Sequence, residues 1–164
     1  MRVIEELGID NLKIIQDDAL YRFTSDSVLL SRFATVKPKD AVADFCSGSG
    51  IVGIHTYALN KDKISSVTMF EMQKSLFDMS MESVKLNGLG NKFFGENVRL
   101  QDVPDRYNEK FSLILCNPPY EKKNGGIDIE NREIAVCKKE IELTLEDITK
   151  SAAKALKFGG RFAM

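Results

Sequence analysis

The sequence is poor in the residues that build metal sites, disulfides and membrane spans. Its 164 residues include no tryptophan, one histidine, three cysteines and four prolines. The cysteines are odd in number and lack the short-range pairs of a zinc site, standing at Cys46, Cys116 and Cys137. No apolar run approaches the roughly 18 residues of a membrane-spanning helix, and the first residues do not resemble a signal peptide. The sequence therefore predicts a cytoplasmic protein with no metal site and no membrane partner.

An excess of charge of one sign is also lacking. The 23 lysines and arginines nearly balance 24 aspartates and glutamates, for a formal net charge of −1. Such a chain has no global positive field of the kind that drives strong non-specific nucleic-acid binding. Contacts with a polyanion would depend on local basic pairs, for which the candidates are Lys37/Lys39, Lys122/Lys123 and Lys138/Lys139. Nothing in the sequence specifies an oligomeric state.

After Pro38, strand-like and helix-like segments alternate. Short apolar runs predict strands at 41–45, 67–70, 98–100 and 111–116, and the beginning of a fifth at 161–164. Helical spacing of apolar residues predicts helices at 51–59, 75–86 and 143–156. This alternation is typical of βαβ units. The sequence thus predicts an α/β fold with a mostly parallel sheet, helices on both faces, and a ligand site at the carboxyl ends of the strands.

The first 37 residues differ in pattern from the rest. Residues 12–16 are strand-like, and a capped helix is predicted at 25–34. We expect residues 1–37 to form a lid or substrate segment over the ligand edge of the sheet, and residues 38–164 to form the core of the same single domain. Because the fifth strand begins only four residues before the end, we expect this core to lack its last strands, as if truncated at the C-terminus.

A glycine-rich turn follows the first core strand. Residues 44–53 read DFCSGSGIVG and contain the pattern G-x-G-x-x-G, with Glu71 standing 21 residues after Gly50. Glycines let a ligand approach the backbone, and a carboxylate at a strand end accepts hydrogen bonds from ribose hydroxyls. Taken alone, the pattern fits a dinucleotide site or a tight turn without a ligand. Asp44 favours another ligand, because a carboxylate before the glycines suits a cationic group and disfavours a pyrophosphate.

The turn resembles the D-x-[GC]-x-G-x-G turn of class I methyltransferases, with Cys46 where many members have glycine. The resemblance implies a Rossmann-like fold and the cofactor S-adenosylmethionine, which has a cationic end and no phosphate. It also implies that the backbone of residues 45–47 faces the methionine moiety, that Glu71 binds the ribose hydroxyls and that Asp102 binds the adenine amino group. The implied cofactor-binding residues are Asp44, Phe45, Cys46, Ser47, Gly48, Gly50, Glu71, Met72, Asp102 and Asn117.

The tetrapeptide Asn117-Pro118-Pro119-Tyr120 directly follows the strand predicted at 111–116. Two prolines remove two backbone donors and stiffen the loop, which leaves its carbonyls free to accept hydrogen bonds. The Asn117 side-chain oxygen and the Pro118 carbonyl can together hold two N–H groups of a planar amine, and Tyr120 offers a ring for stacking. The tetrapeptide resembles the [DNS]-P-P-[YFW] motif of amino methyltransferases that modify adenine N6, guanine N2 or protein glutamine. We therefore predict these four residues to be catalytic.

Together with residues 21–30 (YRFTSDSVLL), the tetrapeptide makes nearly the whole chain resemble the bacterial tRNA(Val) adenine-N6 methyltransferase family. The resemblance implies an RNA substrate, methylated at adenine N6 in a tRNA anticodon loop. Residues 138–140 (KKE) depart from the Arg-His-Glu of many members, whose chains also continue past the fifth strand. Protein glutamine, ribosomal guanine and DNA adenine stay open as other substrates. An NAD-binding oxidoreductase or a non-catalytic nucleotide-binding module stays open as a function of another class.

Overall fold

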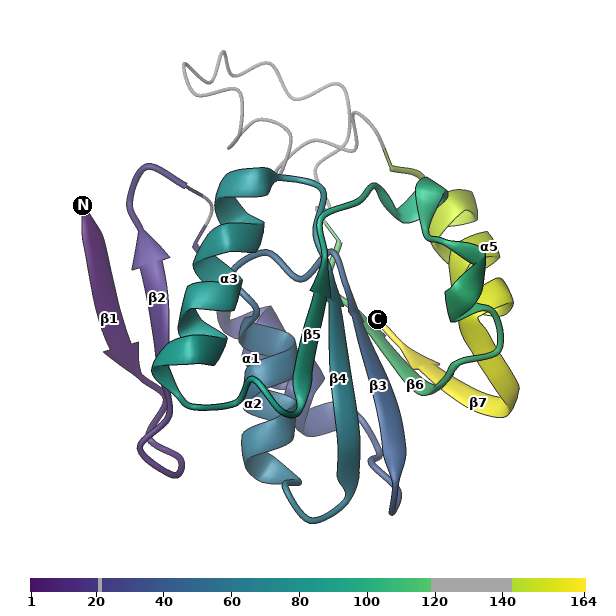
Figure 1. The fold of residues 1–164 in the computed structure, drawn as a ribbon, viewed down its shortest axis with the longest axis horizontal. Coiled ribbons are helices and arrows are strands. Elements are labelled where there is room, and N and C mark those ends of the chain that lie inside the picture. Colours follow the sequence, from purple (N-terminus) through teal and green to yellow (C-terminus); the bar gives the residue numbers. More distant parts are fainter. Residues whose placement is uncertain (21, 119–142) are drawn as a thin grey trace.

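A sheet of five parallel strands forms the centre of the computed structural model, which describes residues 1–20, 22–118 and 143–164 (Figure 1). The strands are β3 Asp40–Phe45, β4 Ile64–Phe70, β5 Phe93–Glu96, β6 Phe111–Cys116 and β7 Leu156–Ala163. Their order across the sheet is β5-β4-β3-β6-β7. From β3 the chain first builds the sheet toward β5 and then returns to add β6 and β7 on the other side. The order therefore reverses between β3 and β6, which is where open α/β sheets bind their ligands.

Helices cover both faces of this sheet. One face carries α1 Ser25–Phe33, α2 Ile51–Leu59 and α3 Lys74–Leu86, and the other carries α5 Leu145–Ala155 with two 3₁₀ turns at Leu100–Asp102 and Asp105–Tyr107 (Figure 1). Alternate strand residues serve the two cores, so that Val42 lies in the core under α2 and Ala43 in the core under α5. The predicted α/β fold, with a parallel sheet between layers of helices, is confirmed. No helix in the described ranges is long and apolar enough to cross a membrane.

The N-terminal residues form a hairpin beside this core. β1 Arg2–Glu6 and β2 Lys13–Asp17 pair antiparallel, with β2 at the place predicted for a strand. Lys13 N donates a 2.8 Å hydrogen bond to Asn87 Oδ1 at the end of α3, and Asn87 Nδ2 donates one of 2.6 Å to Lys13 O. The hairpin therefore lies beside α3 (Figure 1). Within the first 37 residues, it is Phe23 and Ser27 that lie at the carboxyl ends of the core strands.

One strand lies before its predicted position. The strand predicted at 98–100 is β5 at Phe93–Glu96, and Leu100 begins a 3₁₀ turn instead. The prediction failed because Gly95 interrupts the apolar pattern of β5. In the structure a Cβ at Gly95 would stand 2.7 Å from side-chain atoms of both Phe77 and Met81. Glycine is thus required there for α3 to pack closely on β5.

The last helix and strand also meet at a different residue than predicted. The helix expected over 143–156 ends at Ala155, and β7 begins at Leu156 and continues through Gly159 and Gly160. The sequence predicts a helix ending at 156 and a strand beginning at 161, with the two glycines between them. Parallel pairing with β6 extends the strand across them, with a register shift between Phe111 and Leu113 of the partner strand.

Candidate functional site

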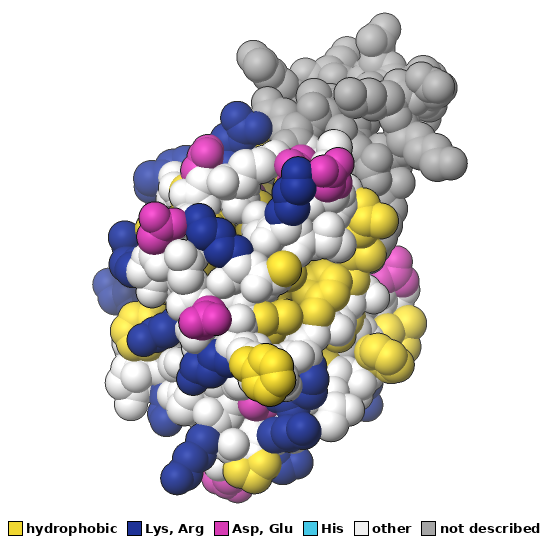
Figure 2. All heavy atoms as spheres, turned by 90° about the vertical axis from the view of Figure 1, so that its right-hand side faces the viewer, with side chains coloured by type: hydrophobic (Ala, Val, Ile, Leu, Met, Phe, Trp, Pro, Cys, Tyr) yellow, Lys and Arg dark blue, Asp and Glu magenta, His cyan; other side chains and the backbone are white. Residues whose placement is uncertain are grey.

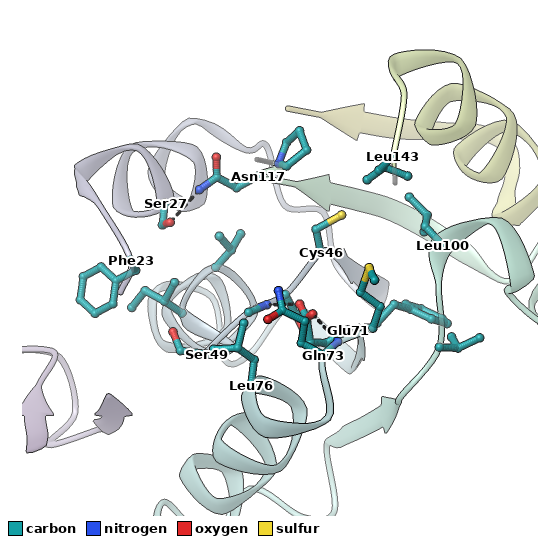
Figure 3. Close-up of a pocket in the computed structure, with 18 of the residues that line it drawn as sticks. Phe23, Ser27, Cys46, Ser49, Glu71, Gln73, Leu76, Leu100, Asn117 and Leu143 are labelled. Atoms are coloured by element: carbon teal, nitrogen blue, oxygen red, sulfur yellow. Dashed lines mark hydrogen bonds between the residues drawn. The ribbon is translucent and has the colours of Figure 1, made fainter. Parts of the chain in front are cut away.

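A pocket opens at the carboxyl ends of β3, β4 and β6, where the strand order reverses (Figure 3). The turn after β3 forms its floor, and the segments that follow β4, β5 and β6 form its walls together with side chains from α1, α2 and α3. Its lining residues are Phe23, Ser27, Cys46, Ser47, Gly48, Ser49, Ile51, Val52, Phe70, Glu71, Met72, Gln73, Leu76, Val98, Leu100, Gln101, Asn117, Pro118 and Leu143.

The turn between β3 and α2 depends on left-handed backbone. Cys46, Gly48 and Gly50 have φ angles of 57°, 53° and 84°. A Cβ at Gly48 would meet nothing within 4 Å, so the backbone there is open to a ligand. A Cβ at Gly50 would stand 3.0 Å from Met69 Sδ, so this second glycine lets the start of α2 pack against β4. The two glycines therefore have different functions, access at Gly48 and close packing at Gly50.

Glu71 follows β4 and brings a carboxylate to the pocket wall. Its side chain is buried, with Oε2 accepting a 2.8 Å hydrogen bond from Gly48 N and Oε1 accepting one of 2.8 Å from Gln73 N. Burial raises the pKa of Glu71, and the hydrogen bonds from these two backbone N–H groups oppose the rise. Each carboxylate oxygen has a second lone pair for a ligand hydroxyl. The glycine turn and the carboxylate are thus held together as one rigid unit.

Asp44 lies behind the glycine turn, wholly buried near the end of β3. Its Oδ2 accepts a 2.8 Å hydrogen bond from Gly53 N in the first turn of α2, and its Oδ1 has no hydrogen-bond partner among the described residues. Burial raises the pKa of Asp44 to about 7, against the lowering effect of the Gly53 N–H bond and with a further rise from the charge of Glu71. The carboxyl group therefore fixes the start of α2 from behind and does not reach the pocket wall.

This buried carboxyl group predicts a pH-dependent stability. Below about pH 4 both the folded and unfolded chains hold the Asp44 proton, whereas between about pH 4 and 7 only the folded chain does. The free energy of unfolding should therefore fall as the pH rises through this window, by roughly 2–4 kcal/mol for Asp44. Asp44→Asn should remove this part of the slope in urea unfolding measured from pH 4 to 8. Equal slopes for the two proteins would show that Asp44 is ionised throughout.

Asn117 brings an amide to the opposite wall of the pocket from Glu71. It follows β6 directly, and its Nδ2 donates a 2.8 Å hydrogen bond to Ser27 Oγ of α1 (Figure 3). The amide oxygen points away from Ser27. Pro118 lines the pocket next to it. The side-chain amide of Asn117 and the backbone carbonyl of Pro118 thus belong to consecutive residues at the carboxyl end of β6.

Cys46 contributes a thiol to the pocket without the properties of a nucleophile. A hydrogen bond with Cys116 raises the pKa of the Cys46 thiol well above its ordinary value, and burial adds to the rise. The charges of Glu71 and Asp44 disfavour the thiolate further. Because the thiolate is the reactive form, Cys46 serves as a packing residue of the turn.

The chemistry of the lining fits the cofactor implied by the sequence better than it fits a dinucleotide. Glu71 supplies an acceptor for ribose hydroxyls, and Ser47 Oγ is buried with no hydrogen-bond partner among the described residues. Met72, Val98 and Leu100 supply an apolar wall for a planar base. The described lining residues include no lysine, arginine or histidine that would neutralise a pyrophosphate. The described residues also contain no group of three or more metal-ligating side chains.

Most of the predicted site residues that the structure describes lie together on this pocket. They are Cys46, Ser47, Gly48, Glu71, Met72, Asn117 and Pro118. The structure does not bring Asp44, Phe45, Gly50 and Asp102 to its wall. Phe45 is buried in the core under α5, with its ring edge to face against that of Phe70 at 5.4 Å, and Asp102 is exposed at the end of a 3₁₀ turn. Pro119 and Tyr120 lie outside the described residues, as do the lysine pairs 122/123 and 138/139.

The pocket also contains residues that sequence reasoning missed. Phe23 and Ser27 reach it from the N-terminal segment, and Val98, Leu100 and Gln101 reach it from the connection after β5. Residues 21–30 contribute to the family resemblance, but the resemblance assigns no role to a single side chain among them. Ser27 carried one usable signal, since a serine on the buried face of an apolar helix needs a polar partner.

Comparison with known proteins agrees with this architecture. A family model described as the methyltransferase small domain matches residues 24–164. The solved structure of P. horikoshii TYW2 in complex with MeSAdo superimposes with a TM-score of 0.63 at 16% identity, covering 95% of this chain and 48% of that one. The YcgJ protein from Bacillus subtilis superimposes with a TM-score of 0.60 at 15% identity, covering 84% of this chain and 48% of that one. Both likenesses support the fold.

Two curated relatives share the same description. A tRNA1(Val) (adenine(37)-N6)-methyltransferase of Actinobacillus pleuropneumoniae serotype 5b is 26% identical over 125 residues, which are 74% of this chain and 50% of the relative. One of Flavobacterium johnsoniae is 21% identical over 150 residues, which are 91% of this chain and 62% of the relative. The chain thus spans about half the length of the first of these relatives and about three fifths of the second.

Proposed function

The chain belongs to the methyltransferase small domain family, and we propose that it transfers a methyl group from S-adenosylmethionine to an exocyclic amine. The observation that carries the proposal is the position of Asn117 and Pro118 on the same pocket as Glu71 and the glycine turn. One wall then has the acceptor for a ribose, and the other has two adjacent acceptors for an amine. A module that only binds a nucleotide would not need the two acceptors for an amine.

Each wall has a distinct task in this proposal. S-adenosylmethionine supplies, when bound, a methyl group on a good leaving group. Glu71 accepts hydrogen bonds from the ribose hydroxyls, and the backbone of Ser47 and Gly48 faces the amino-acid end. Asn117 Oδ1 and the Pro118 carbonyl accept the two N–H bonds of the amine, which holds its nitrogen in line for displacement and draws its lone pair out of conjugation. The contribution of the chain is therefore orientation and polarisation.

We propose adenine N6 in a tRNA anticodon loop as the substrate. Support comes from the description of the curated relatives and from the motif that begins at Asn117. A base in a loop is easier to extrude than a base in a duplex, which suits a protein of net charge −1. On the face in Figure 2, lysine and arginine side chains lie scattered among acidic and hydrophobic ones. The exposed Lys37 and Lys39 precede β3 and stand at the end of the sheet away from the pocket, so they are poor candidates for RNA contacts beside it.

A transfer experiment discriminates between the substrates that share this chemistry. Radiolabelled methyl transfer is measured to total tRNA, duplex DNA, ribosomal RNA and a purified release factor as a source of protein glutamine. We expect label in tRNA, at adenine N6 after nucleoside digestion. Label only in DNA, ribosomal guanine or protein would replace the tRNA assignment while leaving the methyltransferase proposal intact.

A binding experiment separates this proposal from an NAD-dependent enzyme or a nucleotide-binding module. Isothermal calorimetry should detect S-adenosylhomocysteine and give no heat with NAD, because the described pocket lining has a carboxylate and no cationic side chain for a pyrophosphate. Binding of NAD with equal or higher affinity would overturn the cofactor assignment and with it the proposed reaction.

A further inference from the structure

The contact between Ser27 and Asn117 joins two segments that lie 90 residues apart in the sequence. Ser27 belongs to α1, is 2% exposed and lines the pocket, and its Oγ accepts the 2.8 Å hydrogen bond from Asn117 Nδ2 (Figure 3). A side-chain amide presents a donor at one end and an acceptor at the other, and the two ends have nearly the same shape. In the structure Ser27 Oγ accepts from the nitrogen end, and the oxygen end points away from Ser27.

We infer that Ser27 is a positioning residue that holds the Asn117 side chain in place for the substrate amine. The inference rests on the proposed function, in which Asn117 Oδ1 accepts an amine N–H. If the amide turned over, Nδ2 would face the amine and set donor against donor. A serine hydroxyl can accept from Nδ2 or donate to Oδ1, so the bond to Ser27 does not by itself choose between the two orientations. It restrains the Asn117 side chain against α1 before the substrate arrives, which lowers the cost of ordering the site during the reaction.

The helix that carries Ser27 is itself held firmly. One turn further along α1, Ser31 Oγ stands 2.6 Å from His55 Nδ1 on α2, and both residues are buried. Ser31 Oγ also donates a 2.7 Å hydrogen bond to Val28 O, so the proton between Ser31 and His55 belongs to the imidazole Nδ1. This bond adds to the apolar packing of α1 on α2, which includes Leu30 and Ile54. Helix α1 thus contacts Asn117 through Ser27 and α2 through Ser31.

The structure offers a matched pair of variants. Ser27→Ala removes the partner of Asn117, and Ser31→Ala removes an equally buried serine hydroxyl from the same face of the same helix without touching the pocket. With methyl-labelled S-adenosylmethionine and total tRNA, Ser27→Ala should lower kcat by roughly 3- to 10-fold, the effect of losing one neutral hydrogen bond. The KM for tRNA and the affinity for S-adenosylhomocysteine should stay within about 2-fold of the wild-type values. Ser27→Thr keeps the hydroxyl and should restore kcat.

Three kinetic results are possible and each is decisive. A loss of kcat in Ser27→Ala that Ser31→Ala does not share supports the inference. Equal losses in both variants would show that α1 packing, and not the bond to Asn117, matters. An unchanged kcat in Ser27→Ala would overturn the inference and leave the proposed function standing.

A measurement without turnover distinguishes failure of the inference from failure of the proposed function. In ¹⁵N-asparagine-labelled protein, the side-chain NH₂ signals of Asn117 should show slowed hydrogen exchange for the proton donated to Ser27. Ser27→Ala should abolish that protection and Ser31→Ala should retain it. If the wild-type protein methylates no amine but shows this protection, the proposed reaction fails while the contact stands. If the protection is absent or unaffected by Ser27→Ala, the inference fails whatever the activity.

Discussion

Asn117→Ala is expected to reduce methyl transfer by roughly 10²- to 10³-fold in kcat, the range seen when one preorganised polar group is removed from a reacting centre. Asn117 Oδ1 is the only side-chain acceptor that we assign to the amine, and the Pro118 carbonyl is expected to sustain the residual rate. The affinity for S-adenosylhomocysteine, measured by calorimetry, should change only a few-fold, because the Asn117 amide lies across the pocket from Glu71 (Figure 3). Loss of activity with retained binding would place Asn117 in the chemical step.

Asn87→Ala is the matched control for this experiment. Asn87 also anchors a distant segment, since its Nδ2 donates to Lys13 O and Ser83 O and its Oδ1 accepts from Lys13 N. It lies at the end of α3 and does not line the pocket. Its removal should lower the free energy of unfolding while leaving kcat unchanged. If Asn117→Ala lost cofactor binding in proportion to activity, the loop after β6 would be structural and the assignment of the amine site would be wrong.

The parts of the site that could be predicted are those encoded by local signals. The turn after β3 needs left-handed backbone at Gly48 and Gly50, and this requirement is visible in the sequence as two glycines between a strand and a helix. Asn117 was predicted to lie at the ligand edge because a continuous apolar strand ends immediately before it. Glu71 was predicted in the same way from the end of β4. In both cases the functional side chain belongs to the residue that directly follows the strand, so the end of the strand fixes its position.

Other residues could not be placed from the sequence. Their position depends on the direction in which a side chain leaves its strand, or on tertiary packing. Asp44 precedes the glycines as expected, but the alternation of side chains along β3 turns its carboxyl group behind the turn toward Gly53. The resemblance implies a role for Asp102 just past the strand predicted at 98–100. Since β5 ends at Glu96, the residues that reach the pocket are Leu100 and Gln101.

The partner of Ser27 could not be identified from any local pattern. The approach of Ser27 to Asn117 depends on how α1 packs on α2, to which the apolar core and the buried bond between Ser31 and His55 both contribute. A lone histidine on an apolar helix gave no indication of its partner. Contacts at long sequence separation such as these link the N-terminal segment to the site, and only the folded arrangement makes them visible.

Glu71→Ala should weaken binding of S-adenosylhomocysteine by roughly 1.5–3 kcal/mol, which is about a 10- to 150-fold rise in Kd. The loss has two sources in the structure. The ribose hydroxyls would lose a charged acceptor, and Gly48 N would lose the bond that holds the glycine turn against the end of β4. Calorimetry at pH 8 measures the combined effect of these two losses on Kd. An unchanged Kd would remove Glu71 from the cofactor site.

Two further variants test how Glu71 contributes to binding, one as a control and one to isolate the effect of its charge. Glu96→Ala removes a carboxylate from the corresponding end of the neighbouring strand β5, where it binds Arg106 and Tyr107 outside the pocket, and should leave Kd unchanged. Glu71→Gln keeps the side-chain shape and one acceptor but not the charge, so its Kd should lie between those of the wild type and Glu71→Ala. Burial raises the pKa of Glu71, so acidification protonates the wild-type carboxylate and weakens binding as the pH falls. The wild-type Kd should therefore approach that of Glu71→Gln at low pH, whereas equal Kd values for the two proteins at every pH would show that the charge of Glu71 makes no contribution to binding.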